Sequence, residues 1–136
     1  APARWLRGRG GRGGVTVTGR VDDLPGELVR ARVALCPLRI ASGIQNKALE
    51  ALACGLPVVC TERVARALPR SVGEALSVAG DADALAAATV ALLRDPEAAR
   101  SRGAAGRRAV ERTCRWDDAA AAFEELYRAA SGHSRR

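Results

Sequence analysis

A helical stretch between two short apolar runs is the feature that most constrains the fold of this chain. Residues 41–57, ASGIQNKALEALACGLP, place apolar side chains at helical spacing, and Gly55 followed by Pro57 is typical of a helix end. The apolar runs at 33–36 and 57–60 have the length of strands, and the first is short enough to be buried on both faces. A strand, a helix and a strand joined by short links predict two parallel strands with a crossover helix.

The same alternation extends to both sides of this unit. Residues 15–18 predict a strand, and a brief helix through Val29 follows it. Residues 74–78 predict a further strand. Helices are then expected over residues 81–94, from Pro96 to about Cys114, and from Trp116 onward. We therefore expect the α/β class, with a parallel sheet flanked by helices and a helical C-terminal segment.

The start of the central helix carries a group of polar residues that suits an anion. Ser42 and Gln45 have the spacing of a capping box, which predicts Ser42 as the N-cap. Residues 45–47 are the chain's only Gln, only Asn and only Lys, in a chain that otherwise uses Arg as its cation. A helix start with free backbone amides, and with Lys47 close by, favours a phosphate group.

The composition limits the class of protein and the partners that it favours. A chain of 136 residues with 48% hydrophobic content can bury the core of one domain. The formal net charge is +7 and is carried almost entirely by Arg, which favours nucleotides, phospholipid head groups or nucleic acid as partners. Residues 1–14 are rich in Arg and Gly, so they are either an RGG-type nucleic-acid segment or a flexible segment at the edge of a fragment.

Several kinds of site are excluded. The cysteines, Cys36, Cys54, Cys60 and Cys114, have neither CxxC nor zinc-site spacing, which indicates free thiols in a reducing compartment. The only histidine, His133, lies in the tail, which excludes a Ser-His-Asp or Cys-His catalytic device within this chain. No P-loop, dinucleotide-binding glycine motif, hydrolytic pair of acids or metal-ligand pattern is present. No apolar run approaches about 20 residues, so no membrane span is expected.

Five segments, in a fixed order, resemble one enzyme family. They are VTVTGRVDDL at 15–24, VRARVALCPL at 29–38, GIQNKALEALACGLPVV at 43–59, LLRDP at 92–96 and RWDDAAAAFEELY at 115–127. Together they resemble the C-terminal, donor-binding domain of the family-four retaining glycosyltransferases, which have the GT-B fold. The GIQNK segment is most similar to the sugar transferases associated with exosortase systems and with exopolysaccharide synthesis in bacteria.

The resemblance implies a retaining hexosyltransferase with two Rossmann-like domains that face a cleft. The C-terminal domain of such an enzyme binds the nucleotide-sugar donor, and the N-terminal domain binds most of the glycan or lipid-linked acceptor. Residues 15–130 would form the donor domain, 131–136 a disordered tail, and the domain's first strand and the acceptor domain would precede Ala1. Such a fragment is expected to be inactive alone, to need no metal or cofactor, and to be cytoplasmic or peripheral at the inner face of the membrane.

The resemblance also implies roles for single residues. The family places a pair of glutamates on the central helix; Glu50 fills the second position, which contacts the donor ribose, and Ser42 stands at the first. Asn46 lies one turn before Glu50, so the two side chains could share a ligand rich in hydroxyls. The donor diphosphate and sugar would be bound by Arg39, Ser42, Gly43, Ile44, Gln45, Asn46 and Lys47. Gly19 and Val21 would lie near the base, and no catalytic residue or metal ligand is assigned.

Other interpretations of these residues stay open. Lys47 and Glu50 could form an ordinary intrahelical ion pair. Trp116, Phe123 and Tyr127 recur on one helix face, and we expect them to pack in the core rather than to stack on a ligand. The competing function is a non-enzymatic module that binds nucleic acid or an anionic surface through the Arg-rich segments. Donor binding is favoured over it, and no specific nucleic acid is expected.

Overall fold

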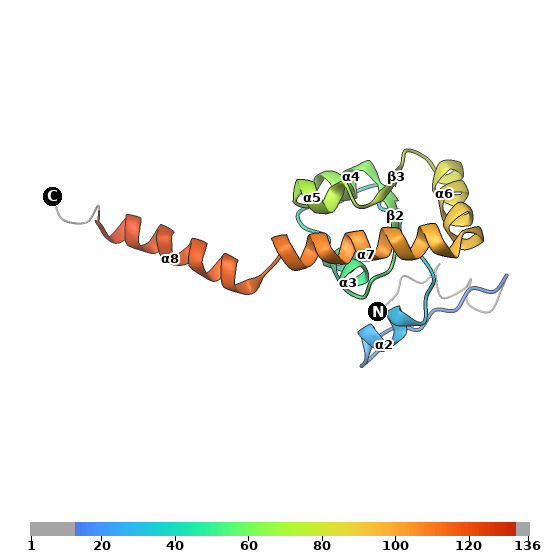
Figure 1. Cartoon of the computed structure of the whole chain (residues 1–136), viewed down its shortest axis with the longest axis horizontal. Helices are drawn as coiled ribbons and strands as arrows, with labels where there is room; N and C mark the ends of the chain where they lie inside the picture. The colour runs from blue at the N-terminus through green and yellow to red at the C-terminus, as the bar shows by residue number, and fades with distance from the viewer. Residues whose placement is uncertain (1–12, 133–136) are drawn as a thin grey trace.

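The computed structural model describes residues 13–132, which include a three-stranded parallel sheet covered by helices (Figure 1). The strands are β1 (Ala34–Cys36), β2 (Val58–Thr61) and β3 (Ser77–Ala79), in the order β1-β2-β3. Cys36 lies opposite Cys60 in the register of the sheet. The predicted α/β class, with a parallel sheet and a helical C-terminal segment, is confirmed.

Helices connect and follow the strands. They are α2 (Leu24–Val29), α3 (Asn46–Ala53), α4 (Glu62–Arg66), α5 (Arg70–Gly73), α6 (Ala82–Arg94), α7 (Pro96–Thr113) and α8 (Trp116–Gly132). The carboxylates of Asp23, Asp81 and Asp95 accept hydrogen bonds from backbone amides in the first turns of α2, α6 and α7. Such caps, with Pro96 at the first position of α7, explain why local sequence predicts these helix starts well.

The core lies on both faces of β2, because successive side chains of a strand point to opposite faces. Val58 and Cys60 pack with Leu52 of α3 and Ala109 of α7 on one face. Val59 packs with side chains of α6 on the other face. The sheet is therefore the middle layer, with α3 and most of α7 on one side and α6 on the other, where Ala99 at the start of α7 also joins the core (Figure 1).

Helix α7 lies very close to α3 because two of its glycines face that helix. A Cβ atom on Gly103 would collide with the backbone carbonyl oxygen of Gly55, and one on Gly106 would meet the side chain of Leu52. Gly55 has φ +77° and is the left-handed residue that follows α3. The predicted end of the central helix is therefore confirmed.

One predicted strand, the start of another and one predicted burial pattern are wrong. Residues 15–18 are not a strand, because no described strand lies beside them to complete their hydrogen bonds. Residues 74–76 belong to the end of α5 and the turn after it, so β3 begins only at Ser77. Leu35 in β1 is 48% exposed, whereas 33–36 was expected to be buried on both faces. Helix α6 packs mainly on β2 and β3 and leaves Leu35 uncovered.

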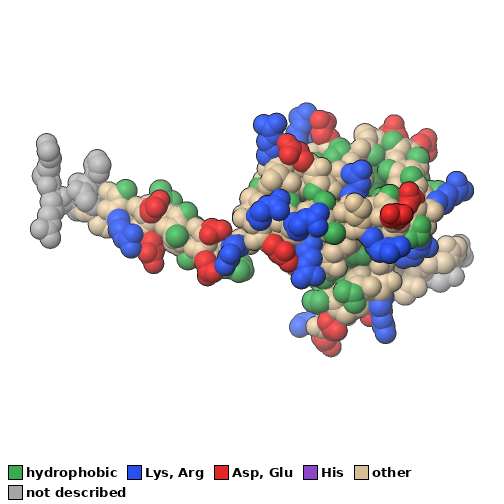
Figure 2. All heavy atoms as spheres, in the orientation of Figure 1, with side chains coloured by type: hydrophobic (Ala, Val, Ile, Leu, Met, Phe, Trp, Pro, Cys, Tyr) green, Lys and Arg blue, Asp and Glu red, His purple; other side chains and the backbone are tan. Residues whose placement is uncertain are grey.

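Helix α8 leads away from the domain instead of packing on it (Figure 1). Trp116 is 90% exposed, Phe123 62% and Tyr127 72%. The prediction that this aromatic face packs in the core is therefore wrong for the part of the chain that the structure describes. Helical periodicity places these residues on one face, but it does not determine what covers that face. In the space-filling view the helix is a narrow arm beside the body of the domain (Figure 2).

The two ends of the chain leave some predictions without a structural counterpart. Residues 1–12 and 133–136 lie outside the described residues. Nearly all of the Arg/Gly-rich start and most of the predicted tail therefore have no structural description. The predicted domain boundaries stay predictions, although α8 continues to Gly132 and so reaches into the segment expected to be disordered. Among the described residues, no helix is both long and apolar enough to cross a membrane.

We predict that the close contact between α3 and α7 makes the two glycines unequal in their tolerance of alanine. Gly103→Ala sets a Cβ against backbone, which cannot move aside, whereas Gly106→Ala meets the end of the Leu52 side chain. Both changes gain the same helix propensity, so the comparison isolates the clash. We expect Gly103→Ala to have an unfolding free energy about 2 kcal/mol below that of Gly106→Ala, measured by urea denaturation. Equal stabilities of the two variants would contradict the close contact.

Candidate functional site

The loop after β1 and the start of α3 lie at the edge of the sheet where the strands end. Because β1 and β2 are parallel and α3 connects them, α3 begins at the carboxyl ends of the strands. The hydroxyl of Thr61, the last residue of β2, donates to the carbonyl oxygen of Leu38 at 2.7 Å. This hydrogen bond fastens the start of the loop to the neighbouring strand. Ligands of open α/β sheets bind at this edge.

The start of α3 differs from the predicted one. The helix begins at Asn46, and its N-cap is Gln45, with no side-chain cap hydrogen bond. Gly43 has φ +68°, so the chain turns between Ser42 and Gln45 and is not helical there. The side-chain Nε2 of Gln45 donates instead to the carbonyl oxygens of Ser42, at 3.3 Å, and Gly43, at 3.1 Å. The predicted capping box, with Ser42 as the N-cap, is therefore wrong.

This turn leaves a series of backbone donors open to solvent. Within the described residues, no acceptor is found for the amides of residues 43–47. The first amides that bond within the helix are those of Ala48 and Leu49, and both bond to the carbonyl of Gln45. Unpaired amides at a helix start carry the positive end of the helix dipole, so the loop is suited to an anion.

A groove of about 740 Å³ lies along one side of α3. Ile44, Asn46 and Glu50, which the sequence had singled out, all line it. The rest of its lining includes the end of α7 and the start of α8, with Val110 and Trp116 among the contributors. Its volume is in the range of small-molecule sites, and its lining is mostly apolar with a few polar side chains, as is usual for such sites.

Lys47 and Glu50 have no charged partner within the part of the chain that the structure describes. Each ion pair there joins an Arg to an Asp or Glu, and the intrahelical pair that Lys47 and Glu50 could form is not made. Lys47 lies close to the end of β1: burial raises the pKa of the Cys36 thiol, and the Lys47 ammonium partly offsets that rise. The helix start therefore offers a cation near the strand end and a carboxylate in the groove.

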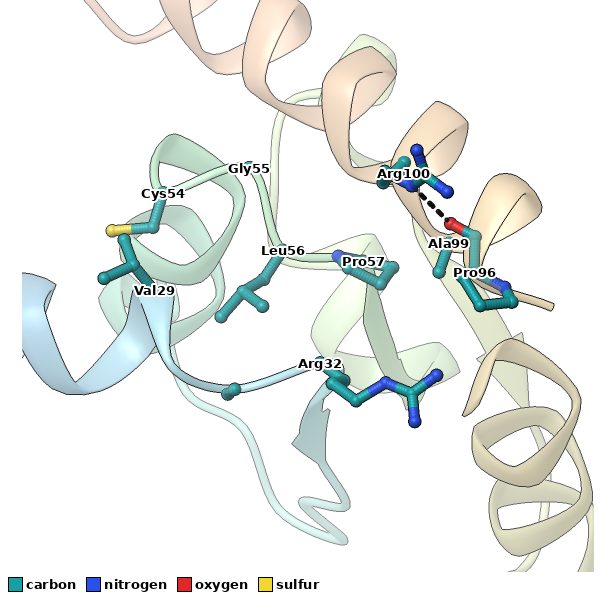
Figure 3. A pocket seen from close by; sticks show the side chains of 10 residues that line it. Val29, Arg32, Cys54, Gly55, Leu56, Pro57, Pro96, Ala99 and Arg100 are labelled. Atoms are coloured by element: carbon teal, nitrogen blue, oxygen red, sulfur yellow. Dashed lines mark hydrogen bonds between the residues drawn. The ribbon is translucent and has the colours of Figure 1, made fainter. Parts of the chain in front are cut away.

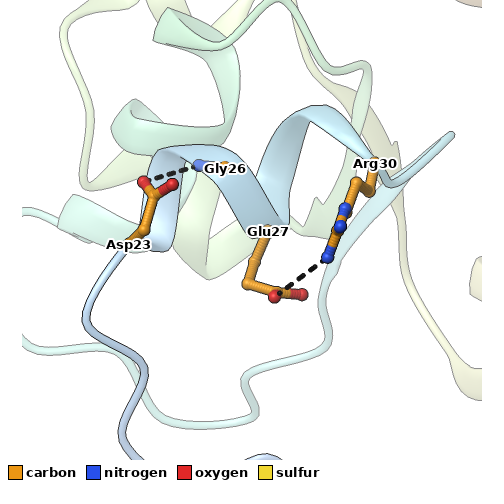
Figure 4. Close-up of polar contacts among 4 residues, drawn as sticks. All are labelled: Asp23, Gly26, Glu27 and Arg30. Atoms are coloured by element: carbon orange, nitrogen blue, oxygen red, sulfur yellow. Dashed lines mark hydrogen bonds and ion pairs between the residues drawn. The ribbon is translucent and has the colours of Figure 1, made fainter.

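The other predicted site residues lie outside the groove. Arg39, Ser42, Gly43, Gln45 and Lys47 are in the loop and first turn beside it. Val21 lines a separate cleft of about 460 Å³ at the start of α2, and Gly19 lies before it. Two of the three acids of that cleft are already engaged, since Asp23 accepts from the amide of Gly26 at 2.9 Å and Glu27 pairs with Arg30 at 3.5 Å (Figure 4). The structure therefore does not bring Val21 and Glu50 into one cavity.

A third cleft, of about 280 Å³, lies at the opposite edge of the sheet, before β1 and β2 begin (Figure 3). Its two cations hydrogen-bond to backbone: Arg32 donates to the carbonyl of Leu93 at 2.7 Å, and Arg100 to that of Pro96 at 3.1 Å. None of the residues predicted for the site lines this cleft. We assign no function to it.

Sequence reasoning missed the part of the groove that comes from the junction of α7 and α8. Arg115, Trp116 and Asp118 all line the groove. Arg115 pairs with Asp117 at 3.4 Å. The only signal in the sequence is the boundary between the two predicted helices at Cys114 and Arg115. At such a boundary, side chains can turn toward a neighbouring element.

Residues 2–95 match the family described as glycosyl transferases group 1, which is more than half of the chain. The chain belongs to the group 1 glycosyltransferases. The match includes the whole sheet, α3 and α6, and ends before α7. With its parallel sheet flanked by helices, this group 1 glycosyltransferase domain has a partial Rossmann-like GT-B fold. No curated protein and no solved structure matches the chain.

We predict that the four thiols of this glycosyltransferase domain differ in reactivity. Burial, reinforced by the neighbouring Cys36 thiol, raises the pKa of Cys60 to about 11, so only about one thousandth of it is thiolate at pH 8. Cys36 is buried as well, whereas Cys54 and Cys114 are half-buried. Alkylation by iodoacetamide at pH 8, followed by mass spectrometry, should label Cys54 and Cys114 first. Labelling of Cys60 at the same rate in the folded protein would contradict its burial.

Proposed function

We propose that this chain binds the nucleotide-sugar donor of a retaining glycosyltransferase, with the diphosphate at the start of α3 and the ribose at Glu50. One observation carries the proposal. The only lysine of the chain and a carboxylate one turn away lie at the carboxyl edge of a parallel sheet, both without a charged partner among the described residues. A ligand with a phosphate end and a hydroxyl end would engage both groups.

The diphosphate end is supported by charge and by backbone geometry. The amides of residues 43–47 point to no acceptor within the described residues, and Lys47 stands in the first turn of the helix. Amides and an ammonium together stabilise phosphate oxygens. Arg39, in the exposed loop before them, would add a further cation. The left-handed Gly43 lacks a Cβ and has open space around it, so a phosphate could approach the backbone there.

The ribose end is supported by the groove. Asn46 and Glu50 both line it, and a carboxylate and an amide together can accept and donate the hydrogen bonds of neighbouring ribose hydroxyls. Ser42, at the position where related enzymes have a glutamate, lies outside the groove, so the contacts of the transferred sugar are left to other groups. The proposal is therefore more specific for the nucleotide than for the sugar.

The loop after β1 and the start of α3 would stabilise the negative charge that develops on the leaving diphosphate during sugar transfer. When the glycosidic bond of the donor breaks, negative charge grows on the leaving diphosphate, and donors already aimed at that place stabilise the transition state without reorganising. We assign this role to the loop amides and to Lys47. From the resemblance we further propose that transfer retains the anomeric configuration, needs no metal and no cofactor, and requires an acceptor domain in addition to this donor domain.

The biological setting is proposed from the resemblance alone. It would be the synthesis of exopolysaccharide or another cell-surface polysaccharide in a bacterium. The enzyme would act in the cytoplasm, with peripheral contact to the inner face of the membrane where its lipid-linked acceptor resides.

We predict that Glu50→Ala weakens the binding of a nucleoside diphosphate at least tenfold, measured by isothermal titration calorimetry with UDP, GDP and ADP on the whole chain. The removed carboxylate would otherwise accept hydrogen bonds from the ribose, and hydrogen bonds to charged groups are worth about 1.5–3 kcal/mol. Glu62→Ala is the matched control, because Glu62 pairs with Arg66 on the exposed surface of α4. A wild-type chain that binds none of these nucleotides would refute the proposal.

The role of Lys47 predicts a different pattern. Lys47→Ala should weaken nucleoside diphosphate binding about tenfold and leave the much weaker binding of the free nucleoside unchanged, because the cation interacts with phosphate only. Saturation-transfer NMR with uridine and UDP would measure both. A loss of equal size for nucleoside and diphosphate would contradict the assignment.

The competing function, binding to any polyanion, makes the opposite prediction. Figure 2 shows the Lys and Arg side chains of the visible face interspersed with Asp and Glu rather than gathered in one patch. Several Arg side chains of the domain are also paired with acids along their own helices. If DNA or heparin bound tightly, with a steep salt dependence that Glu50→Ala did not change, the polyanion function would replace donor binding.

A further inference from the structure

We propose that Trp116 is a ligand-binding residue of the same groove, on which a ring of the donor stacks. This inference rests on the proposed donor-binding function and extends it to a residue that lies beyond the matched family segment. The ring is either the nucleobase or the transferred sugar, since both present a flat or apolar face to an indole.

The position of Trp116 in the groove is the first reason. It lines the same cavity as Asn46 and Glu50, although it lies more than sixty residues later in the chain. A ligand whose hydroxyls bond to Asn46 and Glu50 would therefore have its ring within the lining that Trp116 helps to form.

The exposure of Trp116 is the second reason. At 90% exposed it contributes almost nothing to the core of the described residues, although it is among the largest apolar side chains of the chain. Phe123 and Tyr127, on the same face of α8, are also exposed, but they do not line the groove. All three residues share one helix face, but only Trp116 lies at the groove.

The third reason is that Trp116 directly follows a helix that is packed on the domain. It is the first residue of α8 and follows α7 after only Cys114 and Arg115. Helix α7 is in turn fixed on α3 by the close approach of its glycines, and Val110 near its end also lines the groove. Trp116 therefore lies three residues beyond the end of the helix that packs against the helix of Glu50, which places the indole beside the groove.

The composition of the surrounding lining agrees with a stacked ring. Leu49, Ala53 and Val110 give the groove that Trp116 lines an apolar surface. The cation beside it, Arg115, is paired with Asp117 at 3.4 Å. The indole, rather than a second phosphate-binding cation, is then the group that this end of the groove offers to a ligand.

Intrinsic fluorescence tests the proposal on the whole chain. In a Trp5→Phe background, Trp116 is the only tryptophan, so its emission reports on the groove alone. We expect UDP or another bound nucleoside diphosphate, and the corresponding nucleotide sugar, to quench and shift this emission. Quenching by the diphosphate alone identifies the base as the stacked ring. Quenching that requires the nucleotide sugar identifies the transferred sugar.

Binding affinities provide the matched comparison. Trp116→Ala should weaken about tenfold the binding of the ligand that quenches the Trp116 emission, as loss of one stacked ring does, and Trp116→Phe should retain most of that affinity. Phe123→Ala, on the same exposed face of α8 but outside the groove, should bind as the wild type does. An equal loss in Phe123→Ala would overturn the proposal, because the effect would then belong to the helix as a whole.

The outcomes separate this inference from the function on which it rests. If the diphosphate and the nucleotide sugar both bind, Glu50→Ala weakens their binding, and Trp116→Ala weakens the binding of neither, the role of Trp116 is refuted and donor binding stands. If the wild-type chain binds no nucleotide or nucleotide sugar, both are refuted.

Discussion

The close contact between α3 and α7 is the interaction on which the rest of the structure depends. Gly103 lies directly against the carbonyl of Gly55, where a Cβ atom would collide with backbone, and Gly106 lies against the side chain of Leu52. The contact covers one face of the sheet, where Val58 and Cys60 are buried. The same contact places α7 beside α3, and the end of α7 forms the wall of the groove across from Glu50. The two glycines therefore contribute both to the packing of the core and to the position of the groove wall.

The candidate site combines two kinds of group that a single helix start can present. The turn at Gly43 leaves backbone amides unpaired, and these require no particular side chain. Lys47 and Glu50, in contrast, are side chains of opposite charge that do not neutralise each other within the described residues. A ligand that is anionic at one end and rich in hydroxyls at the other is the natural complement of such an arrangement.

Part of the fold and of the site could be predicted from local sequence, and the reasons differ from element to element. The starts of α6 and α7 were predictable because Asp81, Asp95 and Pro96 act on their own first turns. The strand expected at 15–18 failed because a strand needs a partner, which alternation of β-branched residues cannot supply. The capping box at Ser42 failed because the left-handed Gly43 interrupts it.

The sequence by itself determined the α/β class, the alternation of strands and helices that makes the sheet parallel, and the polar start of α3 that includes Asn46, Lys47 and Glu50. These follow from periodicity, caps and spacing, which act over a few residues. Only the tertiary structure decided that Asn46 and Glu50 line a groove with Trp116, and that Trp116 is exposed rather than buried. The reason is physical: which surface covers a helix face depends on where distant helices lie, and here that depends on how closely α7 can approach α3.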